Sequence, residues 1–267
     1  MKTYYSFFRI RFQIGLQYRS ASVTALITQF LWGFMECLAY KALSETNAVA
    51  FPMEFTALVS YIWLKEAFLA LFTTWMTDNE IFTMIIDGGI AYELCRPVSI
   101  YNMWFSRNIG SRLAAAALRC GPIILAALLL PEPFRLVFPK NMISLCLFII
   151  TMILGLCVTV SFCMLVYILS FFTISPQGLR MVLTGAVEFL SGSIIPLPFI
   201  PNPVRSILEL LPFASMQNVP LRIYSGDLGG IDMIYAIILQ MFWLFALILF
   251  GKLLCRLAER RVVVQGG

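Results

Sequence analysis

Long apolar stretches separated by shorter polar segments are the main pattern along the 267-residue chain. Each stretch has about 20 residues or more, enough for a helix to cross about 30 Å of hydrocarbon at about 1.5 Å per residue. The pattern predicts six membrane-spanning helices, at about 21–43, 55–75, 108–130, 142–172, 181–200 and 231–254.

The first 20 residues show a different pattern, in which apolar and basic residues are mixed. The apolar residues recur at roughly helical spacing: Tyr4, Phe7, Phe8, Ile14 and Tyr18. This predicts an amphipathic helix on the membrane surface over residues 1–20, followed by a single transmembrane domain over 21–267. A basic tail in solution is the alternative. Because no uninterrupted apolar region precedes a small-residue cleavage site, we expect no cleavable signal peptide.

Composition agrees with an all-α integral membrane protein. Hydrophobic residues make up 60% and charged residues 12% of the chain, and the mean hydropathy is +0.88. A soluble domain of this size could not hide so much apolar surface, and a disordered chain would be far more polar. The chain has no histidine, which excludes Ser-His-Asp and Cys-His nucleophile systems and His-ligated metals. The seven cysteines show no C-x-x-C spacing, and those in apolar runs are interpreted as small core residues.

The distribution of Lys and Arg predicts the orientation. With the N-terminus inside, twelve of the 19 basic residues fall in cytoplasmic segments and five in outer segments. Because basic residues are in excess on the cytoplasmic side of membrane proteins, both termini are expected in the cytoplasm. We attribute the net charge of +5 to this excess of basic residues on the cytoplasmic side, and we expect no nucleic-acid partner.

The longest cytoplasmic segment, about 76–107, carries a short amphipathic pattern. Ile81, Ile85 and Ile86 lie on an apolar face, Gly88-Gly89 interrupts it, and Pro97 ends the segment. Four carboxylates lie in the same segment: Asp78, Glu80, Asp87 and Glu93. We interpret the segment as a partner-facing or solvated loop. A two-metal phosphotransferase site and a helix resting on lipid headgroups are the alternatives.

The outer segment after the fifth span is apolar but rich in proline. Six of the residues from Ser193 to Pro220 are prolines. Prolines at this density break a helix, yet the apolar residues favour the membrane. The segment is therefore expected to form a re-entrant hairpin or two short helices packed on the outer ends of the spans.

Five charged residues fall in the interior of predicted spans, at least seven residues from either end: Glu36, Lys65, Glu66, Arg119 and Glu188. Each costs roughly 2.5–3.5 kcal/mol at mid-depth unless it is paired or hydrated. Lys65 and Glu66 are adjacent and point about 100° apart on a helix, so their partners are expected on other helices. Glu66 and Arg119 lie at similar depths and are predicted to form one such pair. A polar translocation path is the other interpretation of these charges.

The chain lacks the motifs of ATP-hydrolysing and hydrolytic enzymes. It contains no G-x-x-x-x-G-K-[ST] loop that could hold the phosphates of ATP, no G-x-S-x-G and no H-E-x-x-H. We therefore predict neither a catalytic site nor a resident cofactor.

Three segments together resemble a known family. The N-terminal helix ends in Q-Y-R-S at 17–20, the loop between spans two and three reads G-I-A-Y-E-L-C-R-P-V at 89–98, and P-L-R-I-Y-S-G follows the outer segment at 220–226. In this order, the whole chain is similar to the permease subunits of ABC-2-type transporters, in the branch found among bacterial exporters. The resemblance implies a multi-pass protein of the bacterial plasma membrane, in a family whose substrates range from antibiotics and peptides to lipids and glycans.

The resemblance also implies partners and a coupling site. Two permeases, identical or different, would pair in the bilayer, and separate ATP-binding-cassette subunits would bind ATP and Mg²⁺. The loop between spans two and three would be the coupling helix that contacts the ATPase. Its residues are Ile81, Ile85, Asp87, Gly88, Gly89, Glu93, Arg96 and Pro97.

The resulting hypothesis is the membrane subunit of an ATP-driven exporter that works by alternating access. Three alternatives stay open: a lipid or glycan exporter of the same architecture, an integral membrane lipid-modifying enzyme, and a self-contained secondary carrier. The absence of histidine and of a carboxylate signature argues against the enzyme. The lack of internal repeats argues against most carriers.

Overall fold

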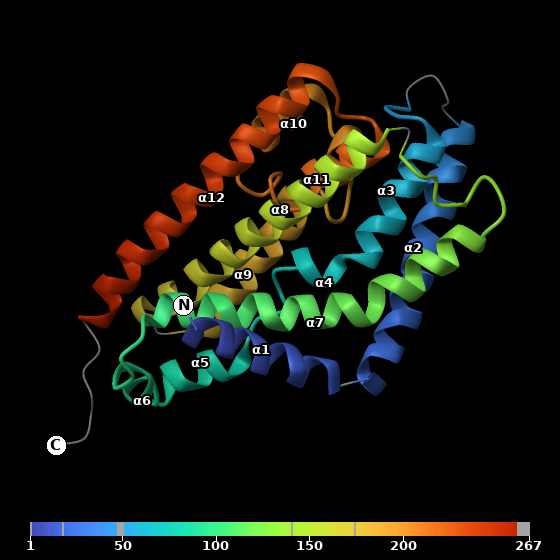
Figure 1. Ribbon diagram of the computed structural model, residues 1–267. Helices are drawn as coiled ribbons and strands as arrows, with labels where there is room; N and C mark the ends of the chain where they lie inside the picture. Colours follow the sequence, from blue (N-terminus) through green and yellow to red (C-terminus); the bar gives the residue numbers. More distant parts are fainter. Residues whose placement is uncertain (1, 18, 47–50, 140, 174, 261–267) are drawn as a thin grey trace.

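The computed structural model describes residues 2–17, 19–46, 51–139, 141–173 and 175–260 (Figure 1). These residues form helices joined by turns and short loops, and no β-strand occurs among them. The all-α prediction is confirmed for this part of the chain. Helices α2 and α12 lie on opposite sides of the molecule, with α7 and α8 between them.

Four of the described helices are long and apolar enough to cross a membrane. Three of them agree with expected spans, at 21–43, 142–172 and 231–254. The four helices are α2 Arg19–Thr46, α7 Ile100–Leu129, α8 Met142–Leu169 and α12 Gly230–Glu259.

Helix α7 begins at Ile100, about two turns before the span expected at 108–130. Ser99 caps it, because its hydroxyl accepts a hydrogen bond from the backbone N–H of Asn102 at 3.5 Å. Pro97 explains why the helix does not begin still earlier, since proline disfavours helical conformation in the residue before it. The added turns place Trp104 and Arg107 beside the segment that precedes α7.

The spans expected at 55–75 and 181–200 are shorter helices in the structure. The first is split into α3 Phe55–Ala67 and α4 Leu69–Phe72, and the second corresponds to α9 Pro176–Leu190. At about 1.5 Å per residue, α3 and α9 are about 20 and 22 Å long, less than the roughly 30 Å of a hydrocarbon core. The expectation of six full-length spans is therefore corrected to four among the described residues.

The second half of α8 forms the centre of the core. All residues from Val158 to Ile168 are buried, because α8 is covered by α12, α11, α7 and α4. The surface of α12 is different, since Ile231, Phe245 and Leu249 are all more than 60% exposed. In a membrane protein such a face meets lipid or another transmembrane helix, so it does not need to be buried within the chain.

The proline-rich segment predicted to lie outside forms two short helices, α10 Asn202–Leu210 and α11 Asn218–Ser225, after a 3-10 turn at Leu197–Phe199. This confirms the two-helix alternative. Helix α9 ends ahead of it at Leu190, and the chain then turns at Gly192, whose positive φ of 78° favours glycine. Helix α11 is buried against α8 and α3. Arg222 of α11 is paired with Asp227 at 2.5 Å and with Glu209 of α10 at 2.6 Å.

The N-terminal segment is the helix α1 Lys2–Gln17, which lies along α7 (Figure 1). Small residues allow this close approach: a Cβ added to Gly110 of α7 would lie 2.7 Å from the backbone oxygen of Phe8. A Cβ added to Gly15 of α1 would lie 2.6 Å from the Cβ of Ala114. The predicted interface helix is thus a helix, and it is packed on α7.

A single methyl group at Gly110 is expected to separate α1 from α7. Because the group it meets is backbone, Gly110→Ala should destabilise the protein by about 1–3 kcal/mol, as overpacking does. Gly185→Ala, at an exposed position inside α9, is the control, since nothing lies within 4 Å of the added Cβ; it should be neutral or slightly stabilising. Thermal unfolding in detergent measures both, and equal midpoints would contradict the close contact.

Candidate functional site

The segment between α4 and α7 folds into two short helices, α5 Asn79–Ile86 and α6 Ile90–Leu94. Asp78 caps α5 by accepting a hydrogen bond from the backbone N–H of Glu80 at 3.1 Å. The turn between the helices passes through Gly88, whose φ of 75° lies in the left-handed region. The amphipathic helix broken at Gly88-Gly89 is therefore confirmed, and Pro97 lies just before α7.

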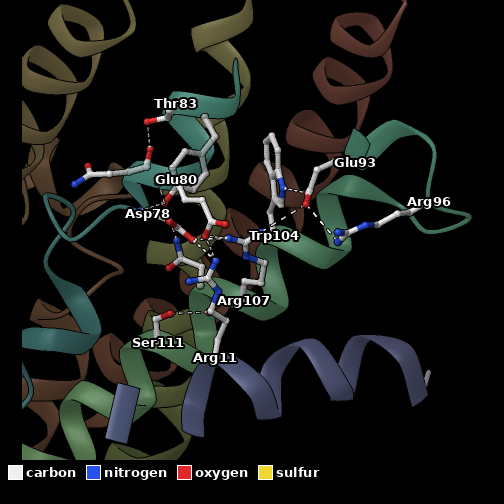
Figure 2. Close-up of polar contacts among 12 residues, drawn as sticks. Arg11, Asp78, Glu80, Thr83, Glu93, Arg96, Trp104, Arg107 and Ser111 are labelled. Atoms are coloured by element: carbon white, nitrogen blue, oxygen red, sulfur yellow. Dashed lines mark hydrogen bonds and ion pairs between the residues drawn. The ribbon is translucent and has the colours of Figure 1, made fainter. Parts of the chain in front are cut away.

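Two arginines from different helices hold the start of α5 (Figure 2). Arg107 of α7 is 3.0 Å from Asp78 and 2.7 Å from Glu80. Arg11 of α1 is 3.5 Å from Asp78 and also donates a hydrogen bond to Glu80. The Arg11 guanidinium, with Arg107 beside it, lowers the pKa of Glu80, so this carboxylate stays charged at neutral pH. The cluster joins α1, α5 and α7 by charge.

Glu93 extends the cluster to α6. Its side chain accepts a hydrogen bond from the indole N–H of Trp104 at 2.9 Å and is paired with Arg96 at 3.4 Å and Arg107 at 3.8 Å. Glu93 is only 4% exposed. Its expected role as a direct contact with a partner is therefore corrected: the carboxylate is already held by groups of the chain itself (Figure 2).

Arg112 is the most buried charge near this site, at 1% exposure. Its guanidinium donates hydrogen bonds to backbone oxygens at the end of α4 and in the loop that follows, among them Thr73 at 2.7 Å and Leu71 at 3.0 Å. It also donates to the side-chain oxygen of Asn108 at 2.6 Å. A cation near the last carbonyls of a helix is favourable, because these oxygens have no partner within the helix.

The count of basic residues included Arg112 among the twelve in cytoplasmic segments, and its role at the end of α4 was not predicted. A signal was present, since Arg112 falls inside the stretch predicted as a span and has no carboxylate three or four residues away. Such a residue must find partners elsewhere in the fold. The sequence did not predict that these partners would be backbone oxygens at the end of a broken helix, because the pattern over 55–75 predicted one unbroken span.

Two further elements contact the start of α5. Arg180 of α9 donates to the side chain of Asn79 at 2.6 Å and to the backbone oxygen of Trp75 at 3.1 Å. The hydroxyl of Tyr167 in α8 accepts the backbone N–H of Asp78 at 2.7 Å. Four helices, α1, α7, α8 and α9, thus hold the segment from Trp75 to Glu80. A displacement of α5 would act on all four.

The two faces of α5 and α6 differ sharply. Ile81 is 1% exposed and packs inside the chain, whereas Ile86 is 56% and Tyr92 81% exposed. Ile85 is half-buried. The expected contribution of Ile81 to a docking face is therefore corrected. Of the other predicted coupling residues, Asp87, Gly88, Arg96 and Pro97 are exposed and Gly89 is half-buried.

Charges inside the helical bundle form a second polar group. The ammonium of Lys65 in α3 lies 2.5 Å from Glu36 of α2 and 3.7 Å from Glu66. It also donates to the backbone oxygen of Ser193 at 3.2 Å. The expectation of a partner on another helix is confirmed for Lys65. The angular separation of neighbours did not prevent the contact with Glu66, because a lysine side chain is long and flexible.

The predicted pair between Glu66 and Arg119 is wrong. Glu66 is paired with Lys65, and Arg119 makes no ion pair with any carboxylate in the described part of the chain; its Nε is buried without a hydrogen-bond partner. Counting residues from a helix end estimates depth but leaves the direction of the side chain undetermined. Glu188 of α9 is half-buried and likewise has no ion-pair partner within the described ranges.

The fold and these contacts define a multi-pass helical membrane protein with a charged cluster at one end. The model of the ABC-2 family transporter protein matches residues 54–266. The chain therefore belongs to this family, whose members are membrane components of transporters. No curated protein matches the chain.

Arg112 and Arg119 offer a matched pair of substitutions on α7. Arg112→Leu strands several buried carbonyls, each of which costs about 1–3 kcal/mol, so a loss of at least about 3 kcal/mol is expected. Arg119→Leu removes a charge that lacks an ion-pair partner among the described residues, and should be neutral or stabilising. Thermal unfolding in detergent distinguishes them. Equal effects would show that Arg112 does not hold the end of α4.

A double-mutant cycle tests the pair of Glu36 with Lys65. Each of Glu36→Gln and Lys65→Met leaves a buried group without its partner, so the double variant should be less destabilised than the sum of the two by about 1–3 kcal/mol. The control cycle of Glu66→Gln with Arg119→Gln should be additive to within about 0.5 kcal/mol. Additivity in the first cycle would contradict the pairing.

Proposed function

We propose that the chain is the permease subunit of an ATP-driven exporter and that the surface formed by α5 and α6 receives a separate ATPase. The observation that carries the proposal is the arrangement of this surface. On its outer side it exposes Ile86 and Tyr92. On its inner side it is bonded to helices α1, α7, α8 and α9 through arginine and tyrosine side chains.

The ATPase is assigned to another polypeptide. The chain has no phosphate-binding loop sequence, and members of the family are membrane components. An apolar side chain beside charged ones is the usual composition for a helix that docks in a partner's groove. Ile86 and Tyr92 would supply the apolar contact, and Asp87 and Arg96 would set the register by charge.

The proposed topology places α5 and α6 in the cytoplasm and α10 and α11 outside. The excess of Lys and Arg in segments on the α5 side supports this orientation. Together with the four long helices, α3–α4 and α9 then make six crossings. These two short elements cross the membrane only because non-helical backbone continues them. In a membrane such backbone is tolerated where the protein covers it, as Arg112 covers the end of α4.

The network suggests how nucleotide-driven motion of the ATPase would reach the membrane. A push on α5 would act on α7 through Arg107, on α1 through Arg11 and on α9 through Arg180. These contacts are short and mostly charge-assisted, so the helices would shift together rather than independently. The ATPase would thereby bias the permease between inward-open and outward-open arrangements. A second permease, identical or different, would complete the pathway.

The observations weigh against a lipid-modifying enzyme. Asp78, Glu80 and Glu93 are all in ion pairs with arginines. A carboxylate neutralised in this way is a poor general base or metal ligand. Among the described residues there is also no group of three or more carboxylate or cysteine side chains that could hold a metal ion.

Recruitment of the ATPase tests the proposal. The full-length chain is purified from membranes together with the ATP-binding subunit that accompanies it. Ile86→Asp with Tyr92→Ala should reduce the retained ATPase about tenfold or more, because central apolar anchors of an interface contribute about 2 kcal/mol or more each. The permease should still insert and unfold at its usual temperature.

The matched control changes the same residue types on α1. Ile10 and Tyr5 are 53% and 64% exposed, so Ile10→Asp with Tyr5→Ala should leave ATPase retention unchanged. Full retention in the α5–α6 variant would place the docking surface elsewhere. Stoichiometric ATP binding by the purified chain alone would overturn the assignment of ATP binding to another polypeptide.

A further inference from the structure

A cavity of about 450 Å³ lies at the same end of the molecule as the charged cluster but is separate from it. Its walls come from the end of α6, the start of α7 and the last turns of α12. Its volume falls in the range of small-molecule binding sites. The lining residues that matter for its chemistry are Leu94, Val98, Ser99, Tyr101, Lys252 and Arg256.

The cavity is positively charged. Lys252 and Arg256 stand one turn apart on α12, and neither forms an ion pair with a described residue. Lys252 lies over the ring of Tyr101, 5.9 Å from its centroid. The first N–H groups of the 30-residue helix α7 add partial positive charge on the opposite wall. Glu259 is the one carboxylate among the lining residues, so two cations face one anion.

The wall on the α12 side leads directly to an apolar surface. Leu253 and Leu257 flank Arg256 along the helix and are 49% and 53% exposed. Further along, Leu249 is 63% exposed. A ligand with a charged head in the cavity could therefore lay an apolar tail along α12. Free anions make no use of such a surface.

We propose that this cavity binds the headgroup of an anionic phospholipid. Basic pockets between transmembrane helices on the cytoplasmic side are suited to such headgroups, because the leaflet there is anionic. The phosphate would contact Lys252, Arg256 and the start of α7, and the acyl chains would lie against Leu253 and Leu257. Because Leu94 and Val98 also line the cavity, the lipid would touch the segment that follows α6.

The proposal concerns a lipid site and does not depend on the docking of an ATPase. It does rest on the proposed topology, which places this end of the molecule at the level of the cytoplasmic headgroups. A lipid held there would fix the end of α12 against the start of α7. These two helices already approach closely, since a Cβ added to Gly251 would lie 2.8 Å from the ring of Tyr101.

Native mass spectrometry of the full-length chain provides the test. Phosphatidylglycerol is titrated into the protein in zwitterionic micelles that contain phosphatidylcholine, and the retained lipids are counted. The wild-type chain should retain phosphatidylglycerol in preference to phosphatidylcholine. Lys252→Ala with Arg256→Ala should weaken that binding about 30-fold, because each basic residue near an anionic surface contributes about a factor of five.

Two control variants make the result specific. Lys2→Ala with Arg9→Ala removes two exposed charges from α1 and should leave the affinity unchanged. Lys252→Arg with Arg256→Lys keeps the charge and should retain the lipid. Equal loss in the α1 variant, or no loss in the α12 variant, would overturn the site.

Two further arms separate the lipid from other anions. Millimolar inorganic phosphate should not displace phosphatidylglycerol, since it has no acyl chains; complete displacement would make the cavity a free-anion site and overturn the lipid assignment. The second arm measures ATPase retention in membranes of phosphatidylcholine alone. If the variant with Lys252→Ala and Arg256→Ala still binds phosphatidylglycerol in micelles but loses the ATPase in these membranes, the two basic residues belong to a protein interface. The lipid proposal then fails while the proposed function stands.

Discussion

The hydrogen bonds from Arg112 to the end of α4 are the contact on which the charged end of the molecule depends. Helix α4 stops at Phe72, and its last carbonyls would otherwise lie in an interior without water, where each unmet acceptor is costly. The guanidinium of Arg112 donates hydrogen bonds to the backbone oxygens of Ala70, Leu71 and Thr73. Because α4 ends there, the chain can turn toward α5, and Asp78 and Glu80 come within reach of Arg107 and Arg11.

The sequence predicted the long helices well and the short ones poorly, for a physical reason. Helices α2, α8 and α12 have uniform apolar faces, so length and hydropathy alone identify them. Segments 55–75 and 181–200 are also largely apolar, but their breaks at Phe68 and Gly192 are fixed by tertiary contacts and by one backbone angle. Neither the tertiary contacts nor the backbone angle can be predicted from hydropathy. The turn at Gly88 was readable, because two adjacent glycines interrupt a periodic pattern.

The candidate site was located from sequence but its orientation was not. The residue types of the segment 78–98 indicated a helix with apolar and charged faces, and the structure has that helix. Which face is buried depends on neighbours far away in the chain: Tyr167 and Arg180 approach from α8 and α9. For the same reason Ile81 and Glu93, predicted as contacts for a partner, are used within the chain, whereas Ile86 and Tyr92 remain outside.

The contacts of α3 and α4 also constrain the order in which the protein can be built. The ribosome makes α4 before it makes α7, and the bond partners of Arg112 at Ala70 and Thr73 precede it by 42 and 39 residues. Until that arginine emerges, the end of α4 has no internal donor for its carbonyls. Lys65 meets Glu36 sooner, because α2 is already complete. The second hydrophobic segment therefore reaches its final position during biogenesis only when the third has been synthesised, and a nascent chain halted in between lacks the groups that fix it.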